Sequence, residues 1–172
     1  MSIRRARIFG LLIAAVVYAI DQGFKDWLIK GLGISQIGDV MEITSFFALR
    51  FTKNFGVSLG LFTAGSPEGR YMLVAMTGAI ALFVAIWLLR ERKLGDIAAL
   101  GLVLGGALGN ITDRYTVGYV IDYADLHFGE FRPFLIFNIA DAAITIGVLI
   151  ILARSLLSRE KPGDAAEPAT ES

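Results

Sequence analysis

The chain has 172 residues, 55% of them hydrophobic, and its sixteen basic residues are balanced by sixteen acidic ones. This composition is too apolar for a water-soluble domain, and the mean hydropathy of +0.64 favours a single membrane domain. The lack of net charge gives no indication of a nucleic-acid partner. Because there is no cysteine and His127 is the only histidine, the sequence excludes disulfides, thiolate nucleophiles and Cys- or His-rich metal sites, and we expect neither a metal nor a cofactor.

The long uncharged runs of the sequence predict a membrane α-helical fold with four transmembrane helices. A helix needs about 20 residues to cross the apolar core of a bilayer. Since the first and last runs are shorter than this, they must be extended through Asp21 and Lys25 and through Asp141, respectively. The expected spans are about 8–28, 70–89, 95–114 and 137–157, within one domain of residues 1–160 that is followed by a disordered cytoplasmic tail, 161–172.

The basic residues lie on one side of these spans. They precede the first span, fill the link between the second and third, and follow the fourth, at Arg4, Arg5, Arg7, Arg90, Arg92, Lys93, Arg154, Arg159 and Lys161. Because cytoplasmic loops carry an excess of Lys and Arg, both termini are expected in the cytoplasm. The first apolar run also fits a secretory signal peptide, but it ends without a small-x-small cleavage sequence, so a retained helix is favoured.

The two segments expected outside the membrane differ in pattern. Apolar residues alternate with small or polar ones over 47–51 and again over 55–61, on either side of Thr52–Asn54. This alternation predicts a β-hairpin within about 40–62, with one apolar face turned toward lipid or substrate. The second outer segment, 115–136, is rich in aromatic residues and is expected to be a short interfacial loop.

Several polar residues of the spans fall at a similar depth. Counted from the cytoplasmic arginines and lysines, helix rise places Asp21 about 21 Å, Asp141 about 20 Å and Asn110 about 25 Å into the membrane, with Asp113 and Arg114 one turn farther out. Ionisable residues at such depth are costly and usually face the interior of the bundle. The sequence therefore predicts a functional polar layer near the outer membrane face.

Each of these residues also has a structural interpretation. Asp21 and Lys25 have the i,i+4 spacing of a pair that stabilises a helix end, and Arg114 has the position of a side chain that snorkels to the interface. Without further information, Asp122 resembles a solvated loop acid. The small-xxx-small spacing of Gly101, Gly105 and Gly109 favours helix packing over ligand binding.

Few hydrolytic chemistries remain for such a sequence. A Ser58–His127 arrangement lacks the strained G-x-S-x-G turn, and a dyad of Ser58 and Lys53 has no supporting motif. Two facing aspartates remain the best option, because one can hold a proton while the other activates a water. Asp141 is one candidate and Asp122 is its best partner, with Asp113 and Asp125 as competitors from the same region.

Five ordered motif blocks carry a resemblance to a known family. They are Asp21–Lys25 (DQGFK), Thr52–Gly60 (TKNFGVSLG), Gly105–Arg114 (GGALGNITDR), Val120–Tyr123 (VIDY) and Phe137–Asp141 (FNIAD). In order and spacing the chain closely resembles bacterial lipoprotein signal peptidase, or signal peptidase II, over about residues 8–157.

The resemblance implies an aspartyl endopeptidase of the bacterial inner membrane. It would remove signal peptides from diacylglyceryl-modified prolipoproteins by cutting before the lipobox cysteine, near the outer membrane face. It implies that Asp122 and Asp141 are the catalytic pair. The supporting positions that it implies are Asp21, Lys25, Asn54, Gly56, Gly106, Asn110, Arg114, Asn138 and Ala140. Gly23 and Ser58 depart from the residues expected at their positions, and neither affects the catalytic pair.

The expected partners are the lipid-modified substrate and membrane lipid, and the chain is expected to be a monomer. The chief alternative is a non-enzymatic membrane carrier or assembly protein that uses the same buried charges, in which Asp122 would be dispensable. A presenilin-type intramembrane protease is disfavoured because its Tyr-Asp and Gly-x-Gly-Asp sequences are absent.

Overall fold

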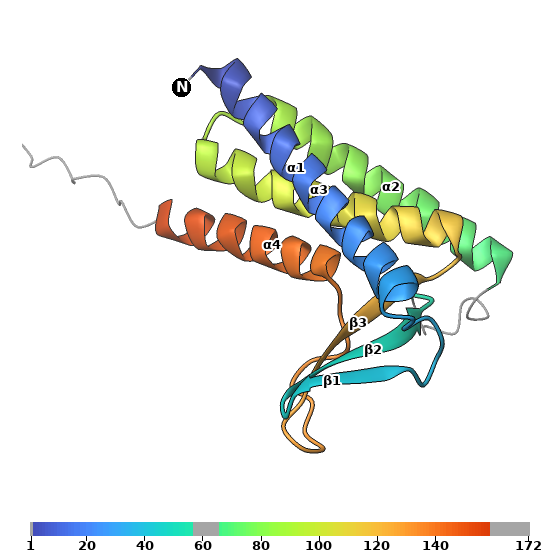
Figure 1. The fold of residues 1–172 in the computed structure, drawn as a ribbon. Coiled ribbons are helices and arrows are strands. Elements are labelled where there is room, and N and C mark those ends of the chain that lie inside the picture. Colours follow the sequence, from blue (N-terminus) through green and yellow to red (C-terminus); the bar gives the residue numbers. More distant parts are fainter. Residues whose placement is uncertain (1, 57–65, 159–172) are drawn as a thin grey trace, which may run out of the picture.

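The computed structural model describes residues 2–56 and 66–158. Four long helices form a bundle, and a small sheet lies at one end of it (Figure 1). The helices are α1 (Ile3–Asp26), α2 (Pro67–Arg90), α3 (Leu94–Thr116) and α4 (Ile139–Ser158), and a π-helical turn, Trp27–Gly31, continues α1. The predicted tail, 161–172, lies outside the described residues.

Helix α3 is the centre of the bundle and packs against each of the other three helices. Its glycines allow close approach: a Cβ at Gly101 would lie 2.5 Å from the carbonyl oxygen of Gly10, and one at Gly105 would lie 2.5 Å from that of Ala14. The interpretation of these glycines as helix-packing positions is confirmed.

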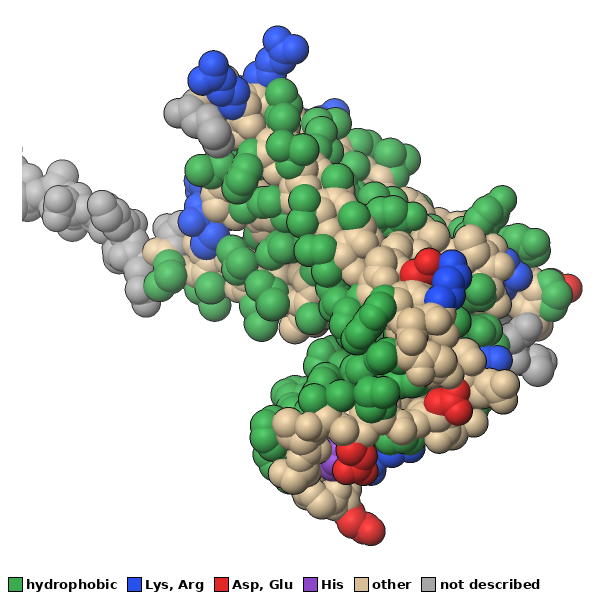
Figure 2. All heavy atoms as spheres, in the orientation of Figure 1, with side chains coloured by type: hydrophobic (Ala, Val, Ile, Leu, Met, Phe, Trp, Pro, Cys, Tyr) green, Lys and Arg blue, Asp and Glu red, His purple; other side chains and the backbone are tan. Residues whose placement is uncertain are grey.

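The surface of the bundle is that of a membrane protein. Within the described residues, three helices are long and apolar enough to cross a membrane, Pro67–Arg90, Leu94–Thr116 and Ile139–Leu157. Figure 2 shows hydrophobic side chains over the sides of the helices and charged ones gathered toward the ends. The helix α1 is as long as α2, carries the Asp21–Lys25 pair and packs along α3.

The sheet is antiparallel, with the order β1 (Val40–Thr44), β2 (Phe47–Asn54) and β3 (Val120–Leu126). A hairpin between the first two helices was predicted, but its strands were placed wrongly. Thr52–Asn54, expected as an interruption, belong to β2, which pairs with β1 on one side and β3 on the other. The predicted second strand falls largely on 57–65, outside the described residues.

Two further expectations about the outer segments were wrong. The apolar residues of β2 do not form a free face: Leu49 and Phe51 are buried with Leu28 of the π-helical turn and Tyr123 of β3. The segment 115–136 is more than an interfacial loop, because it contributes β3. This strand was missed because six of its seven residues are buried, so it lacks the alternation that marks a half-exposed strand.

Candidate active site

Asp141 is held at the first turn of α4. Asn138 precedes the helix, and its Oδ1 accepts a hydrogen bond from the Asp141 amide at 2.8 Å, while Asp141 Oδ2 accepts one from the Asn138 amide at 3.4 Å. This reciprocal pair is a capping box built from Asn and Asp. It places the Asp141 carboxylate at a helix N-terminus, where the helix dipole favours negative charge.

Asp122 comes from the sheet. It lies on β3 opposite Thr52, beyond a register shift between Leu49 and Thr52 that marks an irregularity in β2. Such bulges change the direction in which neighbouring side chains point. The Asp122 side chain is only 2% exposed and accepts a hydrogen bond from Asn54 Nδ2 at 3.0 Å.

Gly56 fixes the orientation of the Asn54 amide. Its backbone N–H donates to Asn54 Oδ1 at 2.9 Å, so the Nδ2 group of Asn54 is left to face Asp122. Gly56 has φ +82°, a conformation that L side chains rarely adopt. A glycine at this position therefore supports the contact between Asn54 and Asp122.

Two asparagines join the aspartates. Asn138 Nδ2 donates to Asp122 Oδ1 at 2.7 Å and to Asn110 Oδ1 at 3.2 Å, and Asn110 Nδ2 donates to Asp141 Oδ1 at 2.7 Å. Asn138 is 1% exposed and Asn110 is 8% exposed. One buried amide network thus contacts both carboxylates, which come from different elements and are 19 residues apart in sequence.

The electrostatics of Asp122 follow from this placement. The pKa of its carboxyl is raised from 3.8 to about 7: burial is the largest cause, the charge of Asp141 acts in the same direction, and the hydrogen bonds from Asn54 and Asn138 oppose the shift. A carboxyl with such a pKa retains a proton close to neutral pH. The pair has the electrostatic character of an acid–base couple.

A second polar network lies behind the aspartates. Lys25 Nζ is 2.7 Å from Asp21 Oδ2 and 2.7 Å from Asp113 Oδ2, and all three side chains are at least 96% buried. Gln22 Nε2 also donates to Asp113 Oδ1 at 2.9 Å and to Asp21 Oδ2 at 3.1 Å. This cluster ties α1 to α3 in the outer part of the bundle.

The same cluster holds the two elements that carry the aspartates. Asp21 Oδ1 accepts from the backbone N–H of Ala140 at 3.0 Å, next to Asp141. Asp113 Oδ2 accepts from the backbone N–H of Ile121 at 3.1 Å, next to Asp122. The charged cluster therefore acts on the site by positioning its backbone.

Gly106 lets α4 approach α3 at this level. A Cβ on Gly106 would collide with the carbonyl oxygen of Ala140 and lie 2.8 Å from Ile144 Cγ1. Ala140 itself is fully buried. Both small residues are thus needed for the start of α4 to reach Asn110 and Asp21.

Arg114 lies in the last turn of α3, close enough to interact electrostatically with Asp113, Asp122 and Asp141. Its Nε atom is buried and has no hydrogen-bond partner among the described residues. Gly56 lies beside it, since a Cβ there would be 3.8 Å from Arg114 Nη2. The guanidinium is a cation near the pair that does not directly bind either carboxylate within the described part of the chain.

The competing aspartates are already engaged. Asp125 is 1% exposed and bound by Arg50 Nε at 3.0 Å and Arg132 Nε at 2.9 Å. Despite the opposing effect of burial, these two arginines hold the pKa of Asp125 below its usual value. Asp113 is paired with Lys25, and neither residue is left to share a proton with Asp141.

The serine alternatives find little support. His127 faces Asp125, with its Nδ1 3.8 Å from Oδ1, and Lys53 Nζ lies 4.8 Å from the centre of the Tyr119 ring. Ser58 lies outside the described residues. Within residues 2–56 and 66–158, no group of three His, Asp or Glu side chains is arranged to hold a metal ion.

An apolar cavity of about 330 Å³ opens beside Asp141. Its walls come from the segment before α4 and from the first turns of that helix, at Phe134, Leu135, Phe137, Ala142, Thr145 and Ile146. Phe134 and Leu135 are exposed, at 61% and 91%. An apolar ligand can therefore reach the Asp141 carboxylate from the hydrocarbon side.

The structure brings the eleven residues singled out from the sequence into one region, in two connected networks and the turns around them. Sequence reasoning missed Gln22, which joins Asp21 to Asp113, and it placed Asp113 in the polar layer and among the rival catalytic acids without its pairing to Lys25. The available signal was the position of Gln22 beside Asp21.

Comparisons with known proteins agree with one another. Residues 13–157 match the family model for signal peptidase (SPase) II. The lipoprotein signal peptidase of Sphingopyxis alaskensis is 52% identical over 165 residues, which cover 95% of this chain and 94% of that protein. That of Rhizorhabdus wittichii is 52% identical over 154 residues, covering 90% and 89%. A bacterial membrane enzyme solved by the in meso method superposes with a TM-score of 0.73 at 28% identity, covering 92% of this chain and 94% of its own.

Proposed function

This chain belongs to the signal peptidase II family, and from that premise we propose that Asp122 and Asp141 are its catalytic pair. The protein is an aspartic-type membrane protease that removes signal peptides from lipoprotein precursors. The observation that carries the assignment is the amide network in which Asn138 contacts Asp122 and caps the helix whose first turn carries Asp141.

The proposed reaction uses water as the nucleophile. One carboxylate of the pair removes a proton from the water, while the protonated partner donates a hydrogen bond to the scissile carbonyl and so polarises it. No covalent intermediate with the enzyme is required. Asn54, Asn110 and Asn138 orient the carboxylates, and Arg114 supplies a nearby positive charge to the reacting region.

The proposed substrate is a prolipoprotein whose lipobox cysteine already carries a diacylglyceryl group. The apolar cavity beside Asp141 and the exposed Phe134 and Leu135 provide a surface for that lipid. Cleavage before the cysteine then places the scissile bond beside both carboxylates. A buried site also excludes water other than the nucleophile.

We also propose a topology for the enzyme in the bacterial inner membrane. Helix α1 also crosses the membrane, which brings the number of proposed spans to four. Its Asp21 and Lys25 face Asp113 of α3 instead of lipid. The basic link between α2 and α3 then lies in the cytoplasm with both termini, and the sheet and catalytic pair lie near the outer face. The enzyme acts as a monomer.

The test compares lipidated and unmodified prolipoprotein as substrates of the purified enzyme. The lipidated form is expected to be cleaved at least about 100-fold faster in kcat/KM, because its lipid is bound next to the reacting bond. Product mass must show cleavage directly before the cysteine. Equal turnover of the two forms would contradict the role given to the apolar cavity, and processing by an Asp122→Asn variant at the normal rate would rule out Asp122 as a catalytic residue.

A further inference from the structure

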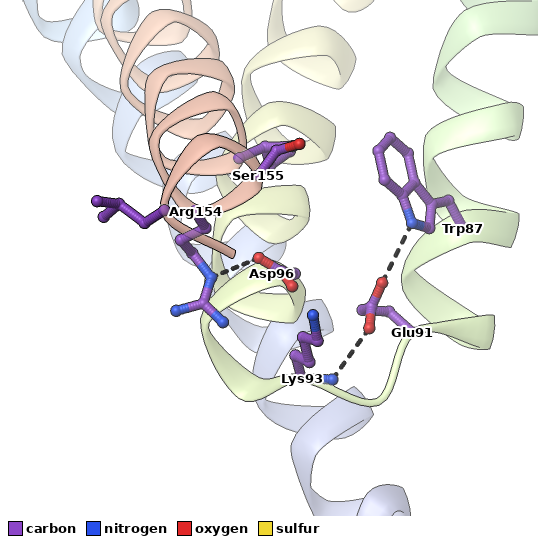
Figure 3. A pocket seen from close by; sticks show the side chains of 8 residues that line it. Trp87, Glu91, Lys93, Asp96, Arg154 and Ser155 are labelled. Atoms are coloured by element: carbon purple, nitrogen blue, oxygen red, sulfur yellow. Dashed lines mark hydrogen bonds and ion pairs between the residues drawn. The ribbon is translucent and has the colours of Figure 1, made fainter. Parts of the chain in front are cut away.

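A cavity of about 500 Å³, lined by both charged and apolar side chains, lies at the end of the bundle opposite the sheet. It is bounded by the C-terminal ends of α2 and α4 and by the first turn of α3 (Figure 3). The proposed catalytic aspartates lie at the opposite end of the bundle, on β3 and in the first turn of α4. The proposed proteolysis therefore makes no use of this cavity.

The two acids that line the cavity are already bound within the protein. Glu91 accepts hydrogen bonds from Trp87 Nε1 at 3.3 Å and from the backbone N–H groups of Arg92 and Lys93 at 2.7 and 3.0 Å. Asp96 Oδ1 accepts from Arg154 Nε at 2.5 Å. Both carboxylates therefore already accept hydrogen bonds from groups of the protein itself.

The two cations of the cavity keep donors for a ligand. Among the described residues, the ion pair of Arg154 with Asp96 uses only Nε, and the two terminal nitrogens of the guanidinium have no carboxylate partner there. Among the described residues, no carboxylate lies within ion-pair distance of Lys93 Nζ. Figure 3 shows the Lys93 ammonium pointing into the space between Asp96 and Trp87.

The remaining walls are apolar and face the membrane. Ile151 and Leu157 of α4 and the ring of Trp87 on α2 line the cavity, and Leu157 is 73% exposed. Both helices are of membrane-spanning length, so their ends place this cavity at the level of the lipid headgroups. Tryptophan is enriched at that level in membrane proteins.

We propose that this cavity binds one membrane phospholipid through its phosphate diester. Lys93 and Arg154 donate charge-assisted hydrogen bonds to the phosphate oxygens, and Ile151 and Leu157 contact the upper part of an acyl chain. The ligand is a phospholipid and not free phosphate, because an apolar wall that includes the exposed Leu157 adjoins the cations. The site does not depend on the assignment of the catalytic pair.

The test uses the two tryptophans of the chain. A Trp27→Phe variant retains Trp87 as its single tryptophan, inside the proposed site. Purified, delipidated protein in detergent is titrated with phosphatidylglycerol brominated in its acyl chains, and quenching of Trp87 fluorescence is measured. Saturable quenching near one lipid per protein is expected, together with retention of one lipid by native mass spectrometry.

Three comparisons decide the outcome. Lys93→Ala, alone or with Arg154→Ala, should raise the apparent Kd at least about tenfold. Arg92→Ala, which removes an exposed neighbouring cation outside the cavity, should leave the Kd unchanged.

Equal quenching in wild type and the double variant would overturn the proposal, as would equal quenching by brominated diacylglycerol, which lacks the phosphate. Displacement of the lipid by millimolar inorganic phosphate would identify a free-phosphate site instead. Since Lys93 has no structural ion pair among the described residues, its single variant keeps the test valid if the double variant is unstable.

Discussion

Two pairs of carboxylates lie in the outer part of this bundle and differ in what surrounds them. Asp21 and Asp113 share the ammonium of Lys25, 2.7 Å from each. Asp122 and Asp141 instead accept hydrogen bonds from neutral amides, and the nearby guanidinium of Arg114 does not bind them directly among the described residues.

The difference supports a structural role for the first pair and the catalytic role that we propose for the second. A cation between two carboxylates neutralises both of them. The remaining oxygens of Asp21 and Asp113 accept hydrogen bonds from the backbone N–H groups of Ala140 and Ile121 and so hold the backbone there. Amide donors orient carboxylates without removing their mutual repulsion, so one of the pair favours a proton. We therefore propose that these similar acids have different roles because different donors surround them.

The largest expected effect is the loss of catalysis in Asp122→Asn and Asp141→Asn. Each change preserves side-chain shape but removes the base or the shared proton, so kcat/KM for lipidated prolipoprotein should fall by more than about 1,000-fold. Circular dichroism and elution volume in detergent should match the wild type. Retention of more than about 10% of activity by either variant would rule out its catalytic role.

The matched control is Asp125→Asn, on the same strand and equally buried. Asp125 is bound by Arg50 and Arg132 and contacts neither catalytic carboxylate. Its replacement should leave kcat within a few-fold of the wild type. A loss as large as that of Asp122→Asn would mean that carboxylates of this strand act through the fold and not through the reaction.

The next largest effect is the destabilisation caused by Lys25→Met. Removing one partner from a buried ion pair typically costs about 3–5 kcal/mol, and here two carboxylates lose their cation. The midpoint of thermal unfolding should fall sharply, and activity should fall with it. Scanning fluorimetry in detergent and the cleavage assay measure the two effects.

Lys30→Met provides the comparison for that variant. Lys30 pairs with Asp26 at the same i,i+4 spacing and the same 2.7 Å distance, but both side chains are more than 60% exposed. An exposed pair contributes little because water competes for both charges. Equal loss of stability in the two variants would contradict the structural role of the buried cluster.

The sequence predicted the helical part of this structure more successfully than the sheet. Long apolar runs define α2, α3 and α4 without knowledge of their neighbours, whereas β3 is recognisable only once β2 and the segment at Phe137 cover its two edges. Thr52–Asn54 looked like a turn because polarity alone does not show that these residues pair with Val120–Asp122.

The sequence predicted which acidic residues belong to the site better than it predicted the role of each one. Intramembrane depth singled out Asp21 and Asp141, and elimination of other chemistries favoured Asp122. The spacing of Asp113 from Lys25 in sequence contains nothing that reveals an ion pair, because that contact depends on α1 packing against α3. The amide of Gln22 became meaningful only in that packing.

The pH profile should show the raised pKa of Asp122. As pH rises through about 7, Asp122 loses its proton beside the charge of Asp141, so activity should fall on the alkaline side of that value. Rates across pH 4–10 provide the measurement. A profile governed by a group near 10, and abolished by Lys53→Ala or Ser58→Ala, would favour the serine–lysine alternative.

The same shift affects stability. Because folding raises this pKa, the stabilising contribution of the protonated form is complete below the ordinary value of 3.8 and is lost as pH rises through about 7. The unfolding midpoint of wild type should therefore fall across this range more than that of Asp122→Asn. Parallel curves would show that Asp122 does not titrate in the folded protein.

The smallest effect expected is that of Asn54→Ala, which should displace the alkaline limb of the pH–activity profile, where the rate falls as Asp122 loses its proton. Asn54 Nδ2 donates to Asp122 Oδ2 at 3.0 Å, and this hydrogen bond lowers the pKa of Asp122 because it favours the charged form. Without the donor the pKa should rise, so the limb should move to higher pH by up to about one unit. Lys53→Ala, beside it on the strand but facing Tyr119, should leave the limb in place. General damage to the sheet would lower the rate at every pH without moving the limb, so a displaced limb in Asn54→Ala alone identifies the amide as the group that adjusts the charge of the pair.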